Sequence, residues 1–250
     1  MWTRRFIRED GRVAERWRDA ELLRALPYAR GDDRAVLFNA LAYSEGSEGP
    51  AQLRLLYASE AGPARSNVLR SLARRCGPAA TDVLSEALRS RSIEVQGTAA
   101  LELAEVGTAD AAEAMFGWLE RKLVRKRREA TWDPYELPSA IKFAARHGLH
   151  LEVARVIAKH WTALDQDEKD WLRRTWPALF EGPGELAVAT QVGPPKHVQD
   201  DVYESQRARR AVQFGEPAAQ SELEEEYIRK ALRKAELNRL RHERTRAGRQ

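Results

Sequence analysis

Two segments of this chain repeat each other at a distance of 31 residues, and this internal period constrains the fold more than any other feature. Residues 65–88 align with residues 96–119. The shift places Val68 on Ala99, Leu69 on Ala100, Leu72 on Leu103, Ala73 on Ala104, Leu84 on Met115 and Leu88 on Leu119. A period of this length is typical of stacked helix pairs, none of which can bury its apolar face alone. The repeat therefore predicts a solenoid of helices.

Proline and glycine mark where the helices of each pair begin and end. Pro63 opens one apolar-periodic segment, Gly77 and Pro78 close it and start the next, and Gly107 ends a third. Proline in the first turn and glycine just past the last are positional preferences of helices. No segment alternates apolar and polar residues as a strand would, so we expect essentially no β-sheet.

The pattern predicts three parts along the chain. Residues 1–180 form a repeat domain, 181–220 a linker that is interrupted by Pro and Gly and partly disordered, and 221–250 a charged amphipathic tail helix. The repeat domain holds about four helix pairs, at 32–60, 62–90, 92–125 and 137–162, between capping helices at 10–26 and 165–179. Capping boxes are expected at Asp165 with Glu168 and at Ser221 with Glu224.

The segments 65–90 and 96–123 resemble HEAT-like repeats of the phycobilisome-lyase type. The residues that carry the resemblance are Ala99, Ala100, Leu101, Leu103, Ala104, Gly107, Thr108, Ala111, Met115 and Leu119. The resemblance implies a right-handed α-solenoid whose concave face is lined by the second helix of each pair. The motif is a packing motif, and family members include scaffolds, lyases, metal-dependent hydroxylases and DNA glycosylases, so it does not by itself assign a function.

Composition sets further limits. The net charge of +4 and the pI of about 9.3 permit an acidic protein or a nucleic acid as partner without requiring either. A single cysteine excludes an intrachain disulfide and suits a reducing, cytoplasmic compartment. The first residues show no signal-peptide pattern, and no apolar run is long enough to span a membrane.

The residues give little support to an enzyme, and we expect no cofactor and no metal. His147 and His150 are separated by a helix-ending Gly148, and the one His-Glu dipeptide, His242–Glu243, lies in the basic tail. Cys76 lies on an apolar stripe, where a small core residue is the simpler interpretation than a nucleophile. Nucleotide-binding and hydrolase motifs are missing from the sequence.

The main hypothesis is a non-enzymatic scaffold that binds a macromolecule, in the first place a protein, through its concave face and tail helix. Polar positions one repeat apart on the second helices, such as Asp82 and Glu113, would belong to one binding surface. The candidate partner-binding residues are Arg54, Asp82, Ser85, Arg89, Glu113 and Phe116.

The alternative hypothesis is nucleic-acid binding by a basic cluster. Its residues are Arg121, Lys122, Arg125, Lys126, Arg127 and Arg128, with Trp132 close by. Cations neutralise phosphates and an aromatic ring can stack on a base. Trp132 and Asp133 would further suit a DNA glycosylase of the HEAT-like class. The competing interpretation is a solvated helix end, where the helix dipole favours cations.

The tail helix has a narrow apolar stripe between basic faces. Its members are Leu223, Tyr227, Ile228, Ala231, Leu232, Ala235 and Leu240. Docking back on the solenoid, pairing with a partner helix, and lying on nucleic acid or an anionic membrane are all compatible with this pattern. The sequence sets no oligomeric state.

Overall fold

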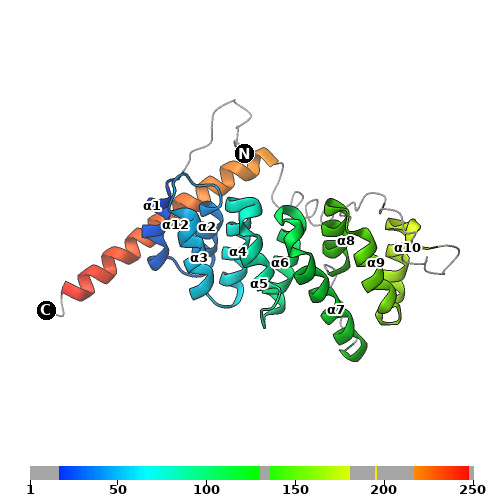
Figure 1. Cartoon of the computed structure of the whole chain (residues 1–250). Helices are drawn as coiled ribbons and strands as arrows, with labels where there is room; N and C mark the ends of the chain where they lie inside the picture. Colours follow the sequence, from blue (N-terminus) through cyan, green and yellow to red (C-terminus); the bar gives the residue numbers. More distant parts are fainter. Residues whose placement is uncertain (1–16, 130–135, 181–194, 196–216, 248–250) are drawn as a thin grey trace. The chain divides into compact units, whose positions relative to one another are not determined.

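The chain is all-α. The computed structural model describes residues 17–129, 136–180, 195 and 217–247, without the side chains of 126–129 and 217–224 (Figure 1). Within these ranges the one β feature is an isolated bridge between Arg18 and Glu45. The elements are α1 (Asp19–Ala25), η1 (Leu26–Tyr28), α2 (Gly31–Leu41), α3 (Gly49–Ser59), α4 (Gly62–Cys76), η2 (Gly77–Ala80), α5 (Thr81–Ala87), α6 (Ile93–Val106), η3 (Ala109–Ala111), α7 (Ala112–Glu129), α8 (Glu136–His147), α9 (His150–Lys159), η4 (Trp161–Ala163), α10 (Gln166–Thr175), η5 (Pro177–Leu179) and α12 (Pro217–Ala247).

The predicted all-α solenoid of helix pairs is confirmed. In the order of the sequence, the predicted pairs correspond to α2 and α3, α4 and α5, α6 and α7, and α8 and α9. The residues that the 31-residue shift superposes are all buried, with at most 2% exposure: Val68, Leu69, Leu72, Ala73, Leu84, Leu88, Ala99, Ala100, Leu103, Ala104, Met115 and Leu119. Gly77 follows the last residue of α4 with φ +56°, a left-handed conformation that suits glycine at a helix end.

Three predicted boundaries differ from the structure. The opening helix begins at Asp19 in the described part, because Arg18 is extended while Trp17 and Asp19 share backbone hydrogen bonds with Glu45. Residues 10–16 of the predicted helix lie outside the described residues. The closing helix ends at Thr175, since Pro177 disfavours a helical Trp176. The tail helix begins at Pro217, so the capping box expected at Ser221 and Glu224 falls inside it. The capping box of Asp165 and Glu168 is present, with bonds of 2.8 and 3.0 Å.

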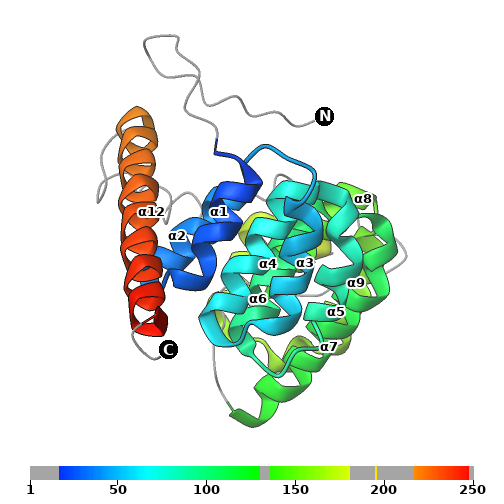
Figure 2. The same cartoon turned by 90° about the vertical axis from the view of Figure 1, so that its left-hand side faces the viewer.

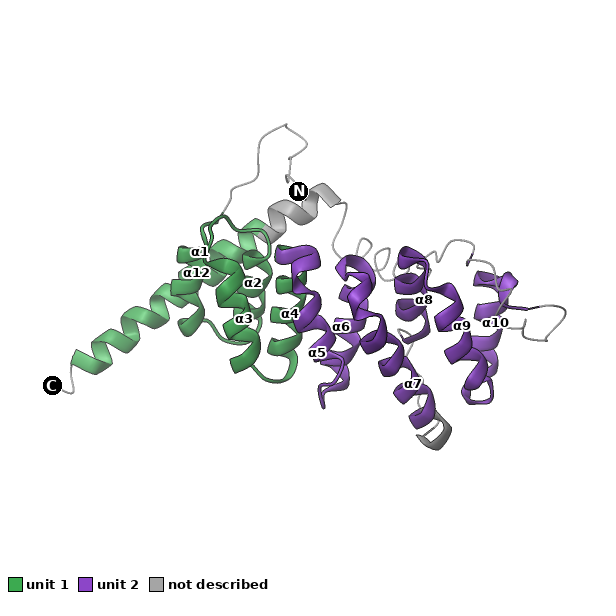
Figure 3. Cartoon of the chain, viewed as in Figure 1, with its two compact units in different colours: residues 1–75, 203–250 green, residues 76–202 purple. Residues whose placement is uncertain are grey.

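The chain forms two compact units, which Figure 3 colours separately. Unit 1 comprises Met1–Arg75 together with Tyr203–Gln250, and unit 2 comprises Cys76–Val202. Unit 1 therefore joins the first helices to the tail helix, α12, which packs against α1, η1 and α2 (Figure 2). Docking on the chain itself, one of the three interpretations of the tail, is the arrangement found in the structure.

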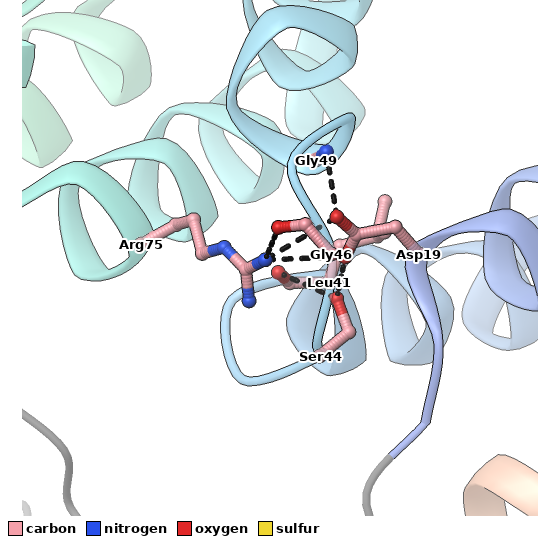
Figure 4. A network of polar contacts seen from close by, with 6 residues as sticks. All are labelled: Asp19, Leu41, Ser44, Gly46, Gly49 and Arg75. Atoms are coloured by element: carbon pink, nitrogen blue, oxygen red, sulfur yellow. Dashed lines mark hydrogen bonds and ion pairs between the residues drawn. The ribbon is translucent and has the colours of Figure 1, made fainter.

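A buried carboxylate joins α1, the α2–α3 connection and α4 within unit 1 (Figure 4). Asp19, which is 2% exposed, accepts hydrogen bonds from Ser44 Oγ and from the Gly49 amide, the latter at 2.7 Å. Arg75 Nη2 lies 3.3 Å from both carboxylate oxygens and donates to the Gly46 carbonyl at 2.8 Å. A Cβ on Gly46 would lie 2.6 Å from Asp19 Oδ2, so a larger residue does not fit there.

In unit 2 the end of α8 completes the hydrogen bonding of the end of α6. The last carbonyls of a helix have no donor within the helix. Arg146 donates to the carbonyls of Ala104, at 2.8 Å, and of Gly107. His147 Nε2 lies 3.1 Å from the same Gly107 oxygen. One helix pair thus satisfies polar groups that the preceding pair leaves open.

Replacing Asp19 with Ala is expected to lower the free energy of unfolding by about 3 kcal/mol, because it leaves Arg75 and two other donors without their acceptor in the interior. Urea denaturation followed by circular dichroism measures the change. The control is Glu48→Ala in the same connection, where the side chain is exposed and makes no capping bond. An equal, small effect of both substitutions would contradict this role of Asp19.

His147 should also make the protein less stable at acidic pH than at neutral pH. Its pKa is lowered, first by burial and then by the charge of Arg146. The unfolded chain consequently takes up a proton at a pH where folded His147 remains neutral. The free energy of unfolding should therefore decrease as pH falls through the ordinary histidine pKa of about 6.5.

His147→Gln keeps a donor for Gly107 but removes this titration, so denaturation curves between pH 7 and pH 5 should show a shallower loss of stability. His242→Gln, an exposed position on α12, serves as the control. If the free energy of unfolding of the His147→Gln variant depends on pH as steeply as that of the parent chain, His147 is not the source of this pH dependence.

Candidate interaction surface

Exposed acidic side chains lie along α5, on η3 and at the start of α7 in unit 2. Asp82 and Glu86 lie on α5, Asp110 on η3 and Glu113 on α7, and all four are exposed. We call these four residues the acidic surface. Both η3 and α7 pack against α5, so the four carboxylates belong to neighbouring elements. Two of them, Asp82 and Glu113, are sequence-predicted partner-binding residues one repeat apart.

Hydrogen bonds link the start of α5 to the turn that precedes η3. The Thr108 amide donates to Thr81 Oγ1 at 3.1 Å, and Thr81 Oγ1 donates to the Pro78 carbonyl at 2.7 Å. Thr108 Oγ1 also donates to Asp110 Oδ2 at 3.0 Å. Asp82 follows Thr81 directly and Asp110 lies two residues after Thr108, so these hydrogen bonds hold both aspartates close to the linked turns.

Sequence analysis missed Glu86 and Asp110. It compared positions separated by one full period, and neither residue has an acidic counterpart at that distance. The available signal was local: Glu86 lies four residues after Asp82, on the same face of a helix, and Asp110 lies three residues before Glu113.

The other predicted partner-binding residues have different surroundings. Arg89 is exposed just after α5, and Ser85 is half-buried. Phe116 is half-buried and packs edge-on against Phe143 of α8, with ring centroids 6.1 Å apart, so it contributes to the packing of α7 on α8. Arg54 lies on α3 in unit 1, half-buried.

The basic cluster lies on α7, which continues to Glu129 rather than ending near 125. Arg121 and Arg125 are exposed on successive turns, although Arg121 also lies 3.4 Å from the Leu88 carbonyl. Lys122 is 12% exposed and pairs with Glu136 at 3.1 Å, over the ring of Trp118. The side chains of Lys126, Arg127 and Arg128, and all of Trp132 and Asp133, lie outside the described residues.

Two tryptophans are core residues. Trp118 is 1% exposed and donates from Nε1 to Gln96 Oε1 at 3.3 Å, and Trp176 is fully buried. Both rings therefore contribute to packing within unit 2.

One carboxylate of α7 is held by α9. Glu120 accepts from Lys159 and lies 3.3 Å from His160 Nε2. These two hydrogen bonds, that of Lys159 first, lower the pKa of Glu120. The site is an ion-paired contact between second helices of consecutive pairs.

The described residues hold no group of three or more His, Cys, Asp and Glu side chains that could bind a metal ion. His147 bonds to Gly107, and Cys76 is half-buried at the end of α4. Among the helices that the structure describes, none is long and apolar enough to cross a membrane.

Comparison with known proteins matches residues 50–132 to the family model of HEAT repeats. The match contains both segments of the 31-residue period and, before them, α3 from Pro50 onward. This part of the chain is a HEAT-like helical repeat, as the resemblance implied. No curated protein and no solved structure matches the chain.

Proposed function

We propose that this chain is a non-enzymatic HEAT-like scaffold that binds a protein partner through the acidic surface and through the tail helix, α12. HEAT repeats commonly serve as protein-interaction scaffolds. The observation that carries the proposal is the placement of Asp82, Glu86, Asp110 and Glu113 on adjacent elements of consecutive repeats, all exposed. The single cysteine suits a reducing compartment, and we propose a cytoplasmic location.

The charge of the acidic surface is complementary to that of a basic segment on the partner. Opposite charges across an interface steer the encounter and fix its register, while like charges discriminate against wrong partners. Because the four carboxylates are exposed, a partner's cations can reach them from solvent.

The double variant Asp82→Lys with Glu113→Lys should bind its protein partner about tenfold more weakly or worse, since two attractive contacts become repulsive. The melting temperature should change little, because both sites are on the surface. Affinity capture from cell extract with quantitative mass spectrometry, followed by titration of the captured protein, measures the effect.

The matched control is Glu94→Lys with Glu152→Lys, two exposed glutamates on α6 and α9 that give the same change in net charge. Capture that survives the Asp82 and Glu113 replacement, or that both pairs reduce equally, would overturn the assignment of this surface.

A second candidate function is nucleic-acid binding by the basic cluster, favoured by the exposure of Arg121 and Arg125 on successive turns of α7. Each phosphate neutralised releases counterions, so log affinity should fall with log salt by about 0.9 per contact. Replacing Arg125, Lys126, Arg127 and Arg128 with Ala should reduce the slope for short duplex DNA by about 3 to 4 units.

Fluorescence anisotropy over a salt series measures this slope. Arg91→Ala with Arg155→Ala, which removes two exposed arginines elsewhere in unit 2, is the control. An unaltered slope in the four-residue variant would rule out the basic cluster as the site.

A further inference from the structure

The tail helix uses only one of its sides to dock within unit 1. Ala231 and Ala235 are buried against this unit, with at most 1% exposure. Asn238 Nδ2 donates to the Tyr28 carbonyl at 3.1 Å, and Lys234 pairs with Asp33 at 3.0 Å. These contacts lie along one stripe of α12 and leave the opposite side to solvent.

Two leucines lie on that opposite side. Leu237 is 56% exposed and Leu240 is 38% exposed, and they are one helical turn apart. Arg233 and Arg241 lie four residues before and after Leu237, and Arg244 lies four residues after Leu240. All three arginines are exposed. We call these two leucines and three arginines the outer face of α12.

The arginines of the outer face differ from their neighbour Arg239. Arg239 is held by Glu236 and Glu243 on its own helix, with contacts of 2.6 Å to each. Within the part of the chain that the structure describes, no carboxylate pairs with Arg233, Arg241 or Arg244. The outer face therefore combines an exposed apolar pair with cations that the fold leaves available.

We infer that the outer face of α12 binds an acidic amphipathic helix of a protein partner. An apolar pair on the partner covers Leu237 and Leu240, and Asp or Glu residues on either side face the arginines. This inference rests on the proposed function, because it specifies which side of the tail helix binds and the chemistry of what it binds.

Other possible ligands would not match both the leucines and the arginines of the outer face. A second copy of α12 would place arginine against arginine, which is repulsive. Nucleic acid would pair with the cations but leave both leucines in water. An anionic membrane could contact both the leucines and the arginines. Helices that lie in a membrane interface insert a wide apolar face, however, and the outer face of α12 has only two leucines.

The test uses the full chain and a synthetic fluorescent peptide of about 21 residues, roughly six helical turns, with Leu at heptad positions a and d and mostly Glu elsewhere. A second peptide has the same composition and charge but no leucine stripe. We expect the striped peptide to bind with an affinity that falls as salt rises, and the scrambled peptide to bind at least about tenfold more weakly.

Two double variants examine the two components of the face. Leu237→Ser with Leu240→Ser, and Arg233→Glu with Arg244→Glu, should each raise Kd for the striped peptide by about tenfold or more. The controls are Leu55→Ser, which changes a leucine of α3 that is 62% exposed, and Arg91→Glu with Arg155→Glu. Circular dichroism confirms that the helices of every variant are retained.

Several results would overturn the inference. They are no binding of the striped peptide, equal binding of the scrambled peptide, and unchanged binding by the leucine variant. Tighter binding of duplex DNA or of phosphatidylserine vesicles that the outer-face variants abolish would assign the face to those ligands. A salt-sensitive dimer of the chain, lost in the arginine variant, would assign it to a second copy.

The inference and the proposed function can fail separately. The Asp82 and Glu113 replacement should leave binding of the acidic peptide intact, because it changes the other surface. If the peptide does not bind while capture still depends on Asp82 and Glu113, only the inference about the outer face of α12 falls.

Discussion

Helix pairs in this chain depend on their neighbours for polar as well as apolar contacts. The end of α6 leaves the carbonyls of Ala104 and Gly107 without donors, and Arg146 of the next pair supplies them. In unit 1, Arg75 of α4 likewise reaches the Asp19 carboxylate and the Gly46 carbonyl. A pair that both covers its neighbour's apolar face and completes its hydrogen bonds cannot be removed without exposing unpaired groups.

The charged residues of the chain therefore fall into two groups, those that form contacts within the fold and those that remain exposed on its surface. Arginines at helix ends, such as Arg146 and Arg75, are committed to backbone carbonyls or to buried carboxylates. The acidic surface and the outer face of α12 contain charged residues that remain exposed. Their opposite signs suit two different kinds of contact, one with a basic segment and one with an acidic helix, in a chain whose net charge is only +4.

Periodicity was enough to predict the helix pairs, because the buried positions recur every 31 residues and burial is what a repeat preserves. It did not predict the continuation of α7 to Glu129, since a solvated basic run carries no apolar period. The Asp19 network was also missed. Its members lie up to 56 residues apart, and neither an isolated aspartate nor a distant arginine signals a partner in the sequence.

The sequence likewise predicted some residues of the two candidate surfaces and missed others. Asp82 and Glu113 followed from the repeat, whereas Asp110 has no acidic counterpart one period away and was signalled only by its local spacing from Glu113. The apolar stripe of the tail was visible in the sequence, but Leu240 does not lie on the same side of the helix as Ala231 and Ala235. Ala231 and Ala235 are buried and Leu240 is exposed, and only the docked position of α12 separates them.

Hydrogen–deuterium exchange of the chain, alone and with a captured protein partner, would show where a protein binds. If the partner binds the acidic surface and the tail helix, protection should increase in α5, η3, the first turns of α7 and α12, with little change elsewhere. Protection that is confined to the last turns of α7, and that duplex DNA produces without any protein, would instead favour nucleic-acid binding.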